Sequence, residues 1–436
     1  MDDFDIVEKK RASTENGKGK SLNFRALYST NHVIDIDEAK KMAMEATSLF
    51  EGDGSLKTAK LRKIEEIRIM EIENEGGTLR SSKVEEFSIP DTLAYLFNFA
   101  DRTGYVIICA DDRIDCPILA FSSEGTLGDE TDNPGMAYAL EAMENYLVQS
   151  ILNFEENKDA MLAEADVQLQ ESLSNLKSTK SGTFKVNLNE KVDPLIYTKW
   201  GQRDPYNKYT PMCDEYSHTP AGCVAVATAQ VMAYYEYPNS LDGYSFNWSG
   251  IKTSPFGRNV SGTHKISIAK LMRSIGDHIG INYTCESSGA NTSNAVSWLK
   301  TLGYQTTSFD YSWEKVKSYL DSKNPILMRG CNKKTAKKKK FLGITIKKTT
   351  TYSEGHAWIV DGYKTTTIKN YSYTRDANTG KQTGKLISTT YSNSFLRMNW
   401  GWEGKSDDVY YTAGCFAPEN SSYNFQYKQE LFVARR

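Results

Sequence analysis

Three short segments of the chain carry residue types that together could perform thiol chemistry. Cys223 opens a run of small and apolar residues, 223–235, which ends before Tyr237-Pro238 and predicts a buried helix. The first turn of a helix has unpaired N–H groups and the positive end of the helix dipole, and both lower the pKa of a cysteine placed there. Because free cysteines are also common as small buried hydrophobes, Cys223 is a candidate nucleophile only if suitable partners accompany it.

Suitable partners for this thiol lie later in the chain. His356 follows Gly355 at the entrance of an apolar run, which predicts a buried strand with the histidine at its start. The separation of 133 residues (356 − 223) is typical of thiol proteases of the papain type. A further 43 residues on (399 − 356), Asn399 ends another predicted strand and could accept a hydrogen bond from the imidazole. The indole of Trp400 could keep water away from that bond.

These segments resemble conserved blocks of the streptopain family, secreted papain-like cysteine proteases of streptococci and Bacteroides-type bacteria. The resemblance rests on residues 219–235, 355–362 and 399–404 in this order, and it extends over most of the chain. It implies an α+β fold in which a papain-like catalytic domain, made of a helical half and a twisted antiparallel sheet, follows a small α+β propeptide domain.

The resemblance also implies a role for each candidate residue. Cys223 is the implied nucleophile, His356 the general base and acid, and Asn399 the residue that orients the imidazole, with Trp400 as its shield. Gln202, which precedes a Pro-Tyr-Asn sequence as in the family, is the implied side-chain donor of the oxyanion hole. One well-placed donor of this kind contributes on the order of 3 kcal/mol to transition-state stabilisation. This chemistry requires neither a metal nor a cofactor.

The substrate pocket is the part of the site where the chain departs from the family. Ala290 stands where the family has a serine on the non-catalytic wall, so the pocket preference of the family does not transfer; Gly355 is the other implied substrate-binding residue. The lysine-rich segment 331–351 is longer than in streptopain. It is interpreted as a solvated β-hairpin, or alternatively as a basic rim that steers acidic substrates into the cleft.

Composition excludes several function classes. The 436 residues carry a net charge of −2 with a pI near 6.3, so we expect no attraction to nucleic acid or anionic membranes. No apolar run is long enough to span a membrane, and residues 1–5 are not typical of a signal peptide. The protein is therefore either cytosolic or made with an export signal absent from this sequence; the resemblance favours a secreted or cell-surface protein. Seven scattered cysteines indicate neither a disulfide framework nor a paired metal site.

The N-terminal part of the chain has no plausible nucleophile and base. We expect a mobile tail over residues 1–30 and an α+β unit over 31–185. Its expected elements are a helix from Asp35, a strand hairpin over 93–110, a strand over 117–121, a helix over 134–154 that could continue to 176, and a linker over 177–185. The unit resembles the family's propeptide, an intramolecular inhibitor; an independent binding domain is the alternative.

The remaining residues, 186–436, are the expected catalytic domain, ending in a strand over 430–434 that completes the sheet. The resemblance places the activating cut near Lys185–Val186 (202 − 16 = 186), with Lys180 as a nearby alternative. We thus predict a monomeric cysteine endopeptidase, made as a zymogen, that hydrolyses protein or peptide substrates. A thiol acyltransferase of the transglutaminase kind and a non-enzymatic adhesin or inhibitor are the competing interpretations.

Overall fold

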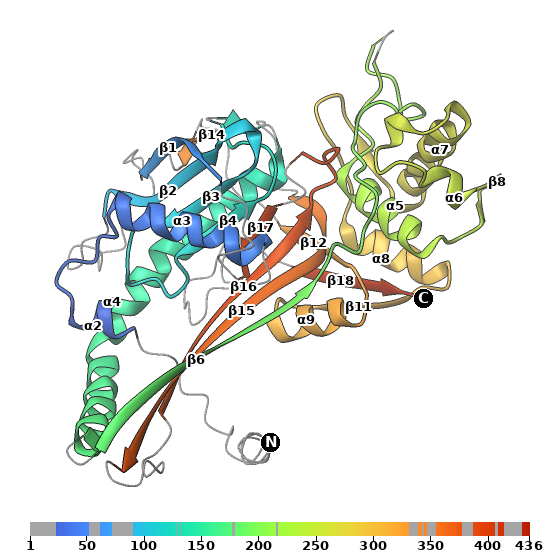
Figure 1. Ribbon diagram of the computed structural model, residues 1–436. Helices are drawn as coiled ribbons and strands as arrows, with labels where there is room; N and C mark the ends of the chain where they lie inside the picture. The colour runs from blue at the N-terminus through green and yellow to red at the C-terminus, as the bar shows by residue number, and fades with distance from the viewer. Residues whose placement is uncertain are drawn as a thin grey trace. The chain divides into compact units, whose positions relative to one another are not determined.

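The computed structural model describes residues 23–51, 62–71, 90–128, 130–131, 133–176, 179–214, 217–330, 339–341, 344–346, 355–376, 387–405, 409–413 and 430–436 (Figure 1). Two compact units are present. The larger comprises His32–Glu156, Leu188–Thr366 and Asn393–Arg436; the smaller comprises Met1–Asn31, Asn157–Asn187 and Thr367–Ser392. Every candidate site residue lies in the larger unit.

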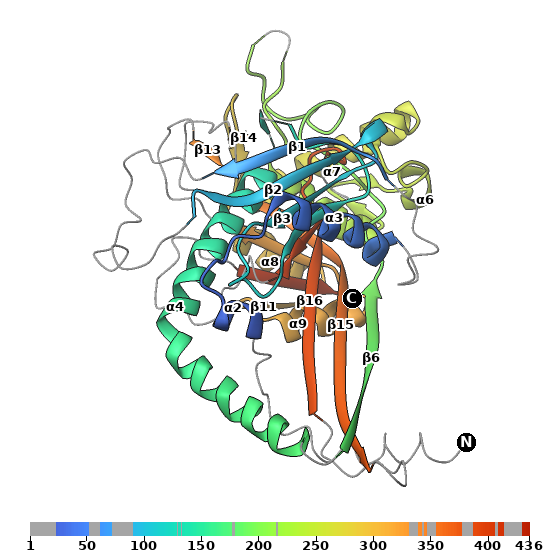
Figure 2. The same cartoon turned by 60° about the vertical axis from the view of Figure 1, so that its left-hand side comes forward.

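The N-terminal part of the larger unit is a four-stranded antiparallel sheet with a helix on it. Its elements are α3 (Ile36–Glu51), β1 (Ile64–Glu71), β2 (Thr92–Phe99), the short turn η1 (Ala100–Arg102), β3 (Tyr105–Cys109) and β4 (Ile118–Ser122). The order is β1-β2-β3-β4, and α3 packs on β3 and β4 (Figure 2). Strands β2, β3 and β4 are buried on both faces, which their continuous apolar sequences favour. The helix, the hairpin and the strand expected here are confirmed.

The helical half of the C-terminal part surrounds α5 (Cys223–Tyr235), whose residues are buried from Cys223 to Ala233. Such a helix is stable only inside a protein, because it has no polar face to turn to water. The other elements of this half are β7 (Ser240–Leu241), β8 (Tyr244–Ser245), α6 (Trp248–Ile251), η2 (Gly257–Asn259), α7 (Gly262–Ile279), β9 (Asn282–Tyr283), β10 (Ser288–Gly289) and α8 (Thr292–Thr301). The expected buried helix beginning at Cys223 is confirmed.

The sheet half carries the other two candidate segments. Its elements are β11 (Gln305–Phe309), α9 (Trp313–Asp321), β12 (Ile326–Gly330), β15 (His356–Asp376), β16 (Ile387–Asn399), β17 (Val409–Thr412) and β18 (Glu430–Arg435). The strand order is β17-β16-β15-β12-β18-β11. His356 is therefore the first residue of its strand and Asn399 the last of its own, as expected, and the predicted final strand inserts between β12 and β11.

The two sheets join edge to edge into one. Strand β4 pairs antiparallel with β17, with Tyr410 opposite Phe121 and Tyr411 opposite Ala120. The helix that follows, α4 (Pro134–Leu176), begins against the C-terminal part and is longer than its apolar spacing alone predicts. Within the larger unit, the N-terminal part thus supplies a neighbouring strand, β4, and a helix, α4, to the C-terminal part.

The expected linker is not what the structure shows, and the expected mobile tail stays a prediction. The expected linker is instead covered by β6 (Thr179–Val192), which pairs with β15. Its alternation of apolar and polar residues over 184–189 is a strand pattern, and a strand can form there because β15 supplies hydrogen-bond partners. The expected mobile tail includes a helix, α2 (Phe24–Tyr28), after 22 residues that lie outside the described ones.

The lysine-rich segment is described in part. Strands β13 (Lys339–Phe341) and β14 (Ile344–Ile346) form the expected antiparallel hairpin. Strand β14 also pairs in parallel with β5 (Glu130–Thr131), which lies just before α4. The rest of this segment lies outside the described residues, so a basic rim stays a prediction.

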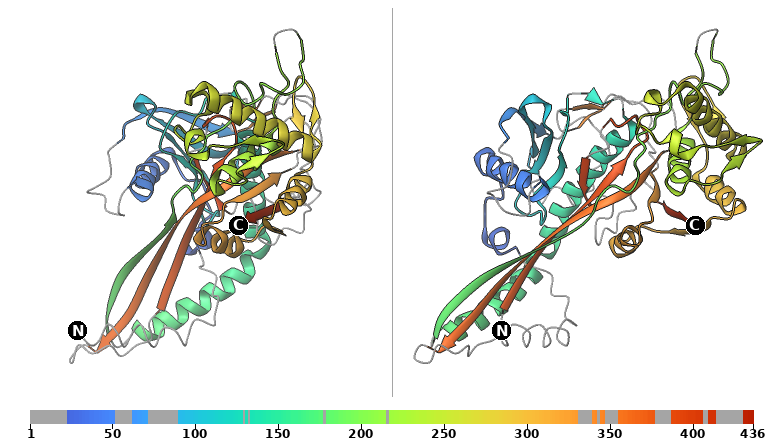
Figure 3. Two further views of the ribbon diagram at one scale, coloured as in Figure 1. Left: turned by 90° about the vertical axis from the view of Figure 1, so that its right-hand side faces the viewer. Right: turned by 45° about the vertical axis from the view of Figure 1, so that its right-hand side comes forward.

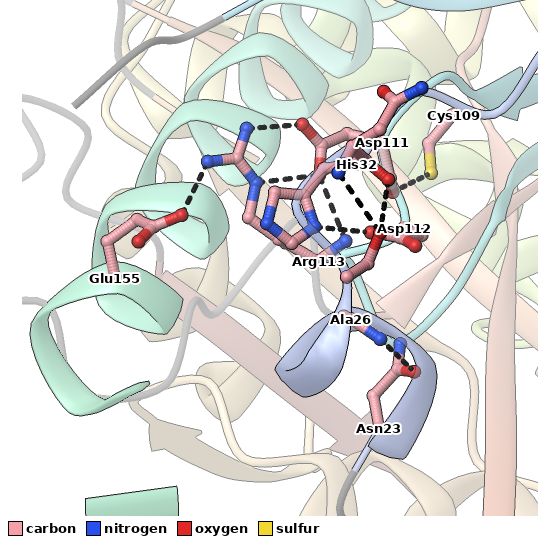
Figure 4. Close-up of polar contacts among 10 residues, drawn as sticks. Asn23, Ala26, His32, Cys109, Asp111, Asp112, Arg113 and Glu155 are labelled. Carbon is pink, nitrogen blue, oxygen red and sulfur yellow. Dashed lines mark hydrogen bonds and ion pairs between the residues drawn. The ribbon is translucent and has the colours of Figure 1, made fainter. Parts of the chain in front are cut away.

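A buried cluster of charges fixes α4 to the loop that follows β3 (Figure 4). The Arg113 guanidinium donates to both carboxylate oxygens of Asp111, at 2.9 and 2.6 Å, and to Glu155 of α4 at 2.7 Å. In the same loop, Asp112 lies 2.8 Å from Nδ1 of His32. The Arg113 guanidinium thus has two carboxylates of opposite charge within hydrogen-bond distance, as low-dielectric surroundings require.

In the smaller unit, the outer parts of β6, β15 and β16 run side by side (Figure 3). Helix α2 contacts the outer half of α4, where Tyr28 donates a hydrogen bond of 2.6 Å to Asp166.

None of the described helices is both long and apolar enough to cross a bilayer. Within the described part of the chain, no cluster of His, Cys, Asp and Glu side chains could hold a metal ion.

Candidate active site

Cys223 occupies the first position of α5, with Gly222 as its N-cap. Gly222 has φ +92°, and a Cβ there would lie 3.1 Å from the carbonyl oxygen of Ser288, so a glycine permits the close approach of β10 to the start of the helix. Before it, the Ala221 N–H donates to the carbonyl of Gln202 at 2.8 Å. This bond brings the half-buried candidate oxyanion residue beside the segment that leads into the candidate nucleophile.

Other described cysteines are poor nucleophiles. Burial raises the pKa of the Cys109 thiol far above its ordinary value and that of Cys116 to about 11, so both stay protonated near neutral pH. Cys213 and Cys285 form a disulfide, which corrects the expectation of no disulfide framework. They lie 72 residues apart, and only folding brings them together.

His356 sits in an aromatic wall formed by Trp358, Trp400 and Trp402, with ring centroids 6.0–6.3 Å away. Its Nε2 atom lies 2.8 Å from the backbone carbonyl oxygen of Trp400. Because a carbonyl only accepts hydrogen bonds, Nε2 carries the proton, and Nδ1 of the neutral ring holds the lone pair. The atom that could take a proton from a thiol is therefore Nδ1.

The His356 ring is kept neutral by its surroundings. His356 is only 8% exposed, and this burial lowers the pKa of its imidazole from the ordinary 6.5 to about 4. The hydrogen bond to the Trp400 carbonyl acts in the opposite direction and raises the pKa. An imidazolium would lose its hydration here, and none of the described residues brings a carboxylate to the ring in exchange. In this form of the protein the base is uncharged at neutral pH.

The side chain of Asn399 bonds to groups other than His356. Its Oδ1 atom accepts from Nε2 of Gln230 at 3.1 Å and from the N–H of Gly401 at 3.2 Å, and its Nδ2 atom donates to the carbonyl of Thr198 at 2.9 Å. The structure therefore brings His356 to the backbone of Trp400 and not to the Asn399 amide. The orienting role inferred for Asn399 stays a prediction.

Sequence reasoning missed Gln230, which connects the segments of the site. This fully buried side chain lies on α5, two turns after Cys223 (230 − 223 = 7), and its Oε1 atom accepts hydrogen bonds from Trp200 N and Thr198 Oγ1, both at 3.1 Å. It joins the nucleophile helix to the segment before Gln202 and, through Nε2, to the end of β16. A single amide within an otherwise apolar helix was the available signal, because buried polar groups need partners.

A buried ion pair holds the two central strands in register near the site. Arg397 of β16 donates to Asp361 of β15 at 2.6 Å, and both side chains are almost fully buried. The same carboxylate oxygen accepts from the N–H of Ile196 at 3.0 Å. Asp361 lies five residues after His356 and Arg397 two residues before Asn399, so the pair fixes both strands close to the candidate residues.

The other predicted residues lie around this centre. The indole of Trp400 is fully buried and packs on Trp358, with centroids 5.0 Å apart. Ala290 is half-buried just after β10, and Gly355 is half-buried just before His356. Ala290 packs against the apolar core that includes Cys223, and its role in a substrate pocket stays a prediction.

Two segments of the chain match known protein families. Residues 200–411 match the Peptidase C10 family, and residues 32–147 match the Spi protease inhibitor family. The chain carries a peptidase C10 domain behind a Spi-type inhibitor domain. It is a cysteine protease with its propeptide inhibitor domain on the same chain, which confirms the predicted enzyme class and removes the acyltransferase and adhesin interpretations.

Individual relatives agree with this assignment. The chain is 24% identical to streptopain of Streptococcus pyogenes over 418 residues, covering 85% of this chain and 84% of streptopain. It is 18% identical to the thiol protease/hemagglutinin PrtT of Porphyromonas gingivalis, covering 74% of this chain and 34% of that protein. In fold it is similar to a prointerpain A fragment of Prevotella intermedia, with TM-score 0.50 and 22% identity over 79% of this chain and 96% of the fragment. The predicted α+β, papain-like fold is confirmed.

Proposed function

We propose that this chain is the latent form of an exported endopeptidase in which Cys223 is the nucleophile and His356 the base. One observation carries the proposal. His356, the candidate base, is held by the Trp400 carbonyl inside an aromatic wall, and the first turn of propeptide helix α4 packs on that same wall. Removal of the propeptide would free the wall, and with it the base.

The proposed reaction begins with transfer of the thiol proton. Nδ1 of His356 accepts it, and the thiolate of Cys223 attacks the carbonyl carbon of a peptide bond. The Gln202 side chain and the Cys223 N–H then donate hydrogen bonds to the oxyanion. His356 returns the proton to the leaving amine and afterwards activates the water that hydrolyses the thioester.

The first turn of α4 is the proposed inhibitory contact. Asn133 caps the helix by accepting from the N–H groups of Gly135 and Met136, at 2.9 and 3.2 Å, and its amide donates to the carbonyl of Lys405 at 3.1 Å. A Cβ on Gly135 would overlap the indole of Trp400, so the helix backbone lies directly against that ring. One asparagine thus joins the propeptide helix to the loop that follows Trp400.

A second contact of α4 reaches the other side of the wall. The ring of Tyr138 packs on Trp358 with centroids 5.2 Å apart, and Tyr411 donates to the sulfur of Met136 at 2.8 Å. Together with the β4–β17 pairing, these contacts support the proposal that the chain's own propeptide is an intramolecular inhibitor. It would act on the part of the site that holds the candidate base, His356. They would be lost together when the propeptide leaves.

The activating cut is proposed near Lys185–Val186, at the proposed boundary between propeptide and catalytic domain. This bond lies within β6, which is paired with β15. A protease binds its substrate as a single extended chain, so β6 must first separate from β15 to be cut. Activation therefore requires local opening of β6. An exposed linker, in contrast, could be cut without any such opening.

Export is proposed from two observations. The curated relatives include streptopain and PrtT, and the chain contains the Cys213–Cys285 disulfide, a bond typical of oxidising compartments outside the cytosol. The proposed substrates are proteins and peptides. The expectations of a monomer, of no nucleic-acid partner and of no cofactor stay predictions.

The test compares the purified chain with its Cys223→Ala, His356→Ala and Asn399→Ala variants. We expect casein hydrolysis by the wild type after conversion, a large fragment beginning near Val186, and no hydrolysis by the Cys223 and His356 variants. Iodoacetamide should label the converted wild type at about pH 5, whereas the His356 variant should label like an ordinary thiol with a pKa near about 8.5. Full activity of the uncut chain, or equal labelling of both proteins, would contradict the proposal.

A further inference from the structure

The candidate oxyanion donor, Gln202, begins one loop, residues 202–221, and the candidate nucleophile, Cys223, follows two residues after the end of that loop. The loop leaves at Gln202 and is closed at its base by the bond from Ala221 N to the Gln202 carbonyl, 2.8 Å. Across its middle, the Asn207 amide donates to two backbone carbonyls of the returning arm, both at 3.1 Å. Cys213 lies near the far end of this loop, where its N–H donates to a backbone carbonyl four residues on, at 2.8 Å.

The opposite wall of the proposed cleft is a small hairpin, residues 282–289, formed by β9 and β10. Its second strand contacts the start of α5, because Ser288 O would lie 3.1 Å from a Cβ on Gly222. The chain then continues directly into Ala290, the candidate pocket residue. Cys285 occupies the turn of this hairpin and is exposed to solvent.

A disulfide joins the tip of the loop to the turn of the hairpin, with Cα atoms of Cys213 and Cys285 5.4 Å apart. Away from the disulfide, the loop runs into α5 at Cys223, and the hairpin contacts α7, where the Arg273 guanidinium lies 5.3 Å from the centre of the Tyr283 ring. We propose that this disulfide is a staple that fixes the pocket wall at Ala290 relative to Cys223, and that thiol reductants therefore control substrate affinity as well as the nucleophile. The inference rests on the proposed function of Cys223.

The staple and the nucleophile have opposite redox requirements. Cys223 reacts only as a reduced thiolate, whereas the staple exists only when oxidised. A small dithiol opens the staple when its thiolate attacks one sulfur and displaces the other cysteine, and its second thiol then resolves the mixed disulfide. Two electrons pass from the dithiol to the protein, each released cysteine takes up a proton, and the dithiol ends as a cyclic disulfide. Activity should therefore rise and then fall as reductant increases.

The first test is a double substitution, Cys213→Ser with Cys285→Ser, which removes both sulfur atoms of the disulfide and so leaves neither partner as a new free thiol. The matched control is Ser217→Ala with Glu286→Gln, which changes an exposed residue in each segment and keeps the disulfide. Kinetics are measured per active site, counted by iodoacetamide labelling of Cys223. We expect the double variant to raise KM about tenfold with kcat within about twofold, since misplacing a binding wall weakens substrate binding. An unchanged KM, or a loss confined to kcat, would overturn the staple.

The second test titrates the wild type with dithiothreitol. KM should climb to the value of the double variant as the reductant opens the staple, while the double variant itself should not respond beyond the level that keeps Cys223 reduced. Equal responses of both proteins would refute the inference. Two readouts do not need activity: non-reducing peptide mapping must show the Cys213–Cys285 link, and hydrogen exchange over 282–290 must speed up in the double variant. If these hold while no substrate is cleaved, the proposed function fails and the staple stands; if they fail, the staple falls.

Discussion

Acid should weaken the closed, latent state of this protein, because His356 is buried there as a neutral base. Its pKa is lowered from 6.5 to about 4, chiefly by burial among indoles. Between these two values an opened chain binds more protons at this site than the closed chain does. The stabilisation is therefore complete above about pH 6.5, shrinks as the pH falls below that value, and is lost once the pH has passed through about 4.

The size of the effect follows from the shift. Two and a half pKa units correspond to about 3 kcal/mol of closed-state stability between neutral pH and pH 4. Between pH 7 and pH 5 the loss is about 2 kcal/mol, a factor of about 20 in the equilibrium between closed and opened chains. Neutral conditions should thus preserve latency, and mild acid should promote opening.

The assay uses the Cys223→Ala chain, which cannot process itself, and the same chain with His356→Gln, which cannot take up the proton. Urea unfolding is followed from pH 8 to pH 4, and the difference between the two proteins is plotted against pH. The glutamine side chain can still donate a hydrogen bond to the Trp400 carbonyl. The difference between the two proteins therefore reports protonation of His356 and not the loss of that hydrogen bond. We expect the difference to be flat above pH 7 and to change by about 2 kcal/mol by pH 5.

An independent measurement is the carbon-13 NMR titration of the imidazole, with the His356→Gln spectrum used for assignment. The His356 signal should titrate near pH 4 in the uncut chain and at a higher pH after removal of the propeptide, where a thiolate stabilises the imidazolium. Parallel stability curves for the two proteins, or a midpoint at or above 6 in the uncut chain, would refute the reasoning.

Three further predictions concern residues that hold the site together. Arg397→Met leaves Asp361 buried without its partner and should lower the free energy of urea unfolding by about 3–5 kcal/mol; a change under about 1 kcal/mol would contradict the buried pair. Asn133→Ala removes a helix cap worth about 1 kcal/mol and the hydrogen bond to Lys405, so self-conversion, timed by gel electrophoresis, should be faster than in the wild type. A slower conversion would count against the proposed inhibitory contact of α4. Gln230→Ala should cost about 1–3 kcal/mol in stability and lower kcat more than it raises KM, whereas an effect on KM alone would show that Gln230 does not position the catalytic segments.

The sequence alone determined the elements that present the chemistry, because those patterns are local. A run of small apolar residues closed by proline places Cys223 at a helix start, and an apolar run after Gly355 places His356 at a strand start. The order and spacing of these segments suggested a thiol protease, and their resemblance to a known family then implied the enzyme class, which the family matches confirm.

The tertiary structure decided which groups meet, because contacts between distant segments leave no local pattern. Asn399 was the natural acceptor for the His356 ring by residue type, yet the backbone carbonyl of Trp400 occupies that place and the amide turns to Gln230. Backbone groups are the same at every residue, so no sequence signal marks the one that accepts. The expected linker became β6 for the same reason, since a strand exists only where another strand supplies its hydrogen bonds. The pairing of Cys213 with Cys285 likewise depends on two loops meeting in space, which spacing along the chain does not specify.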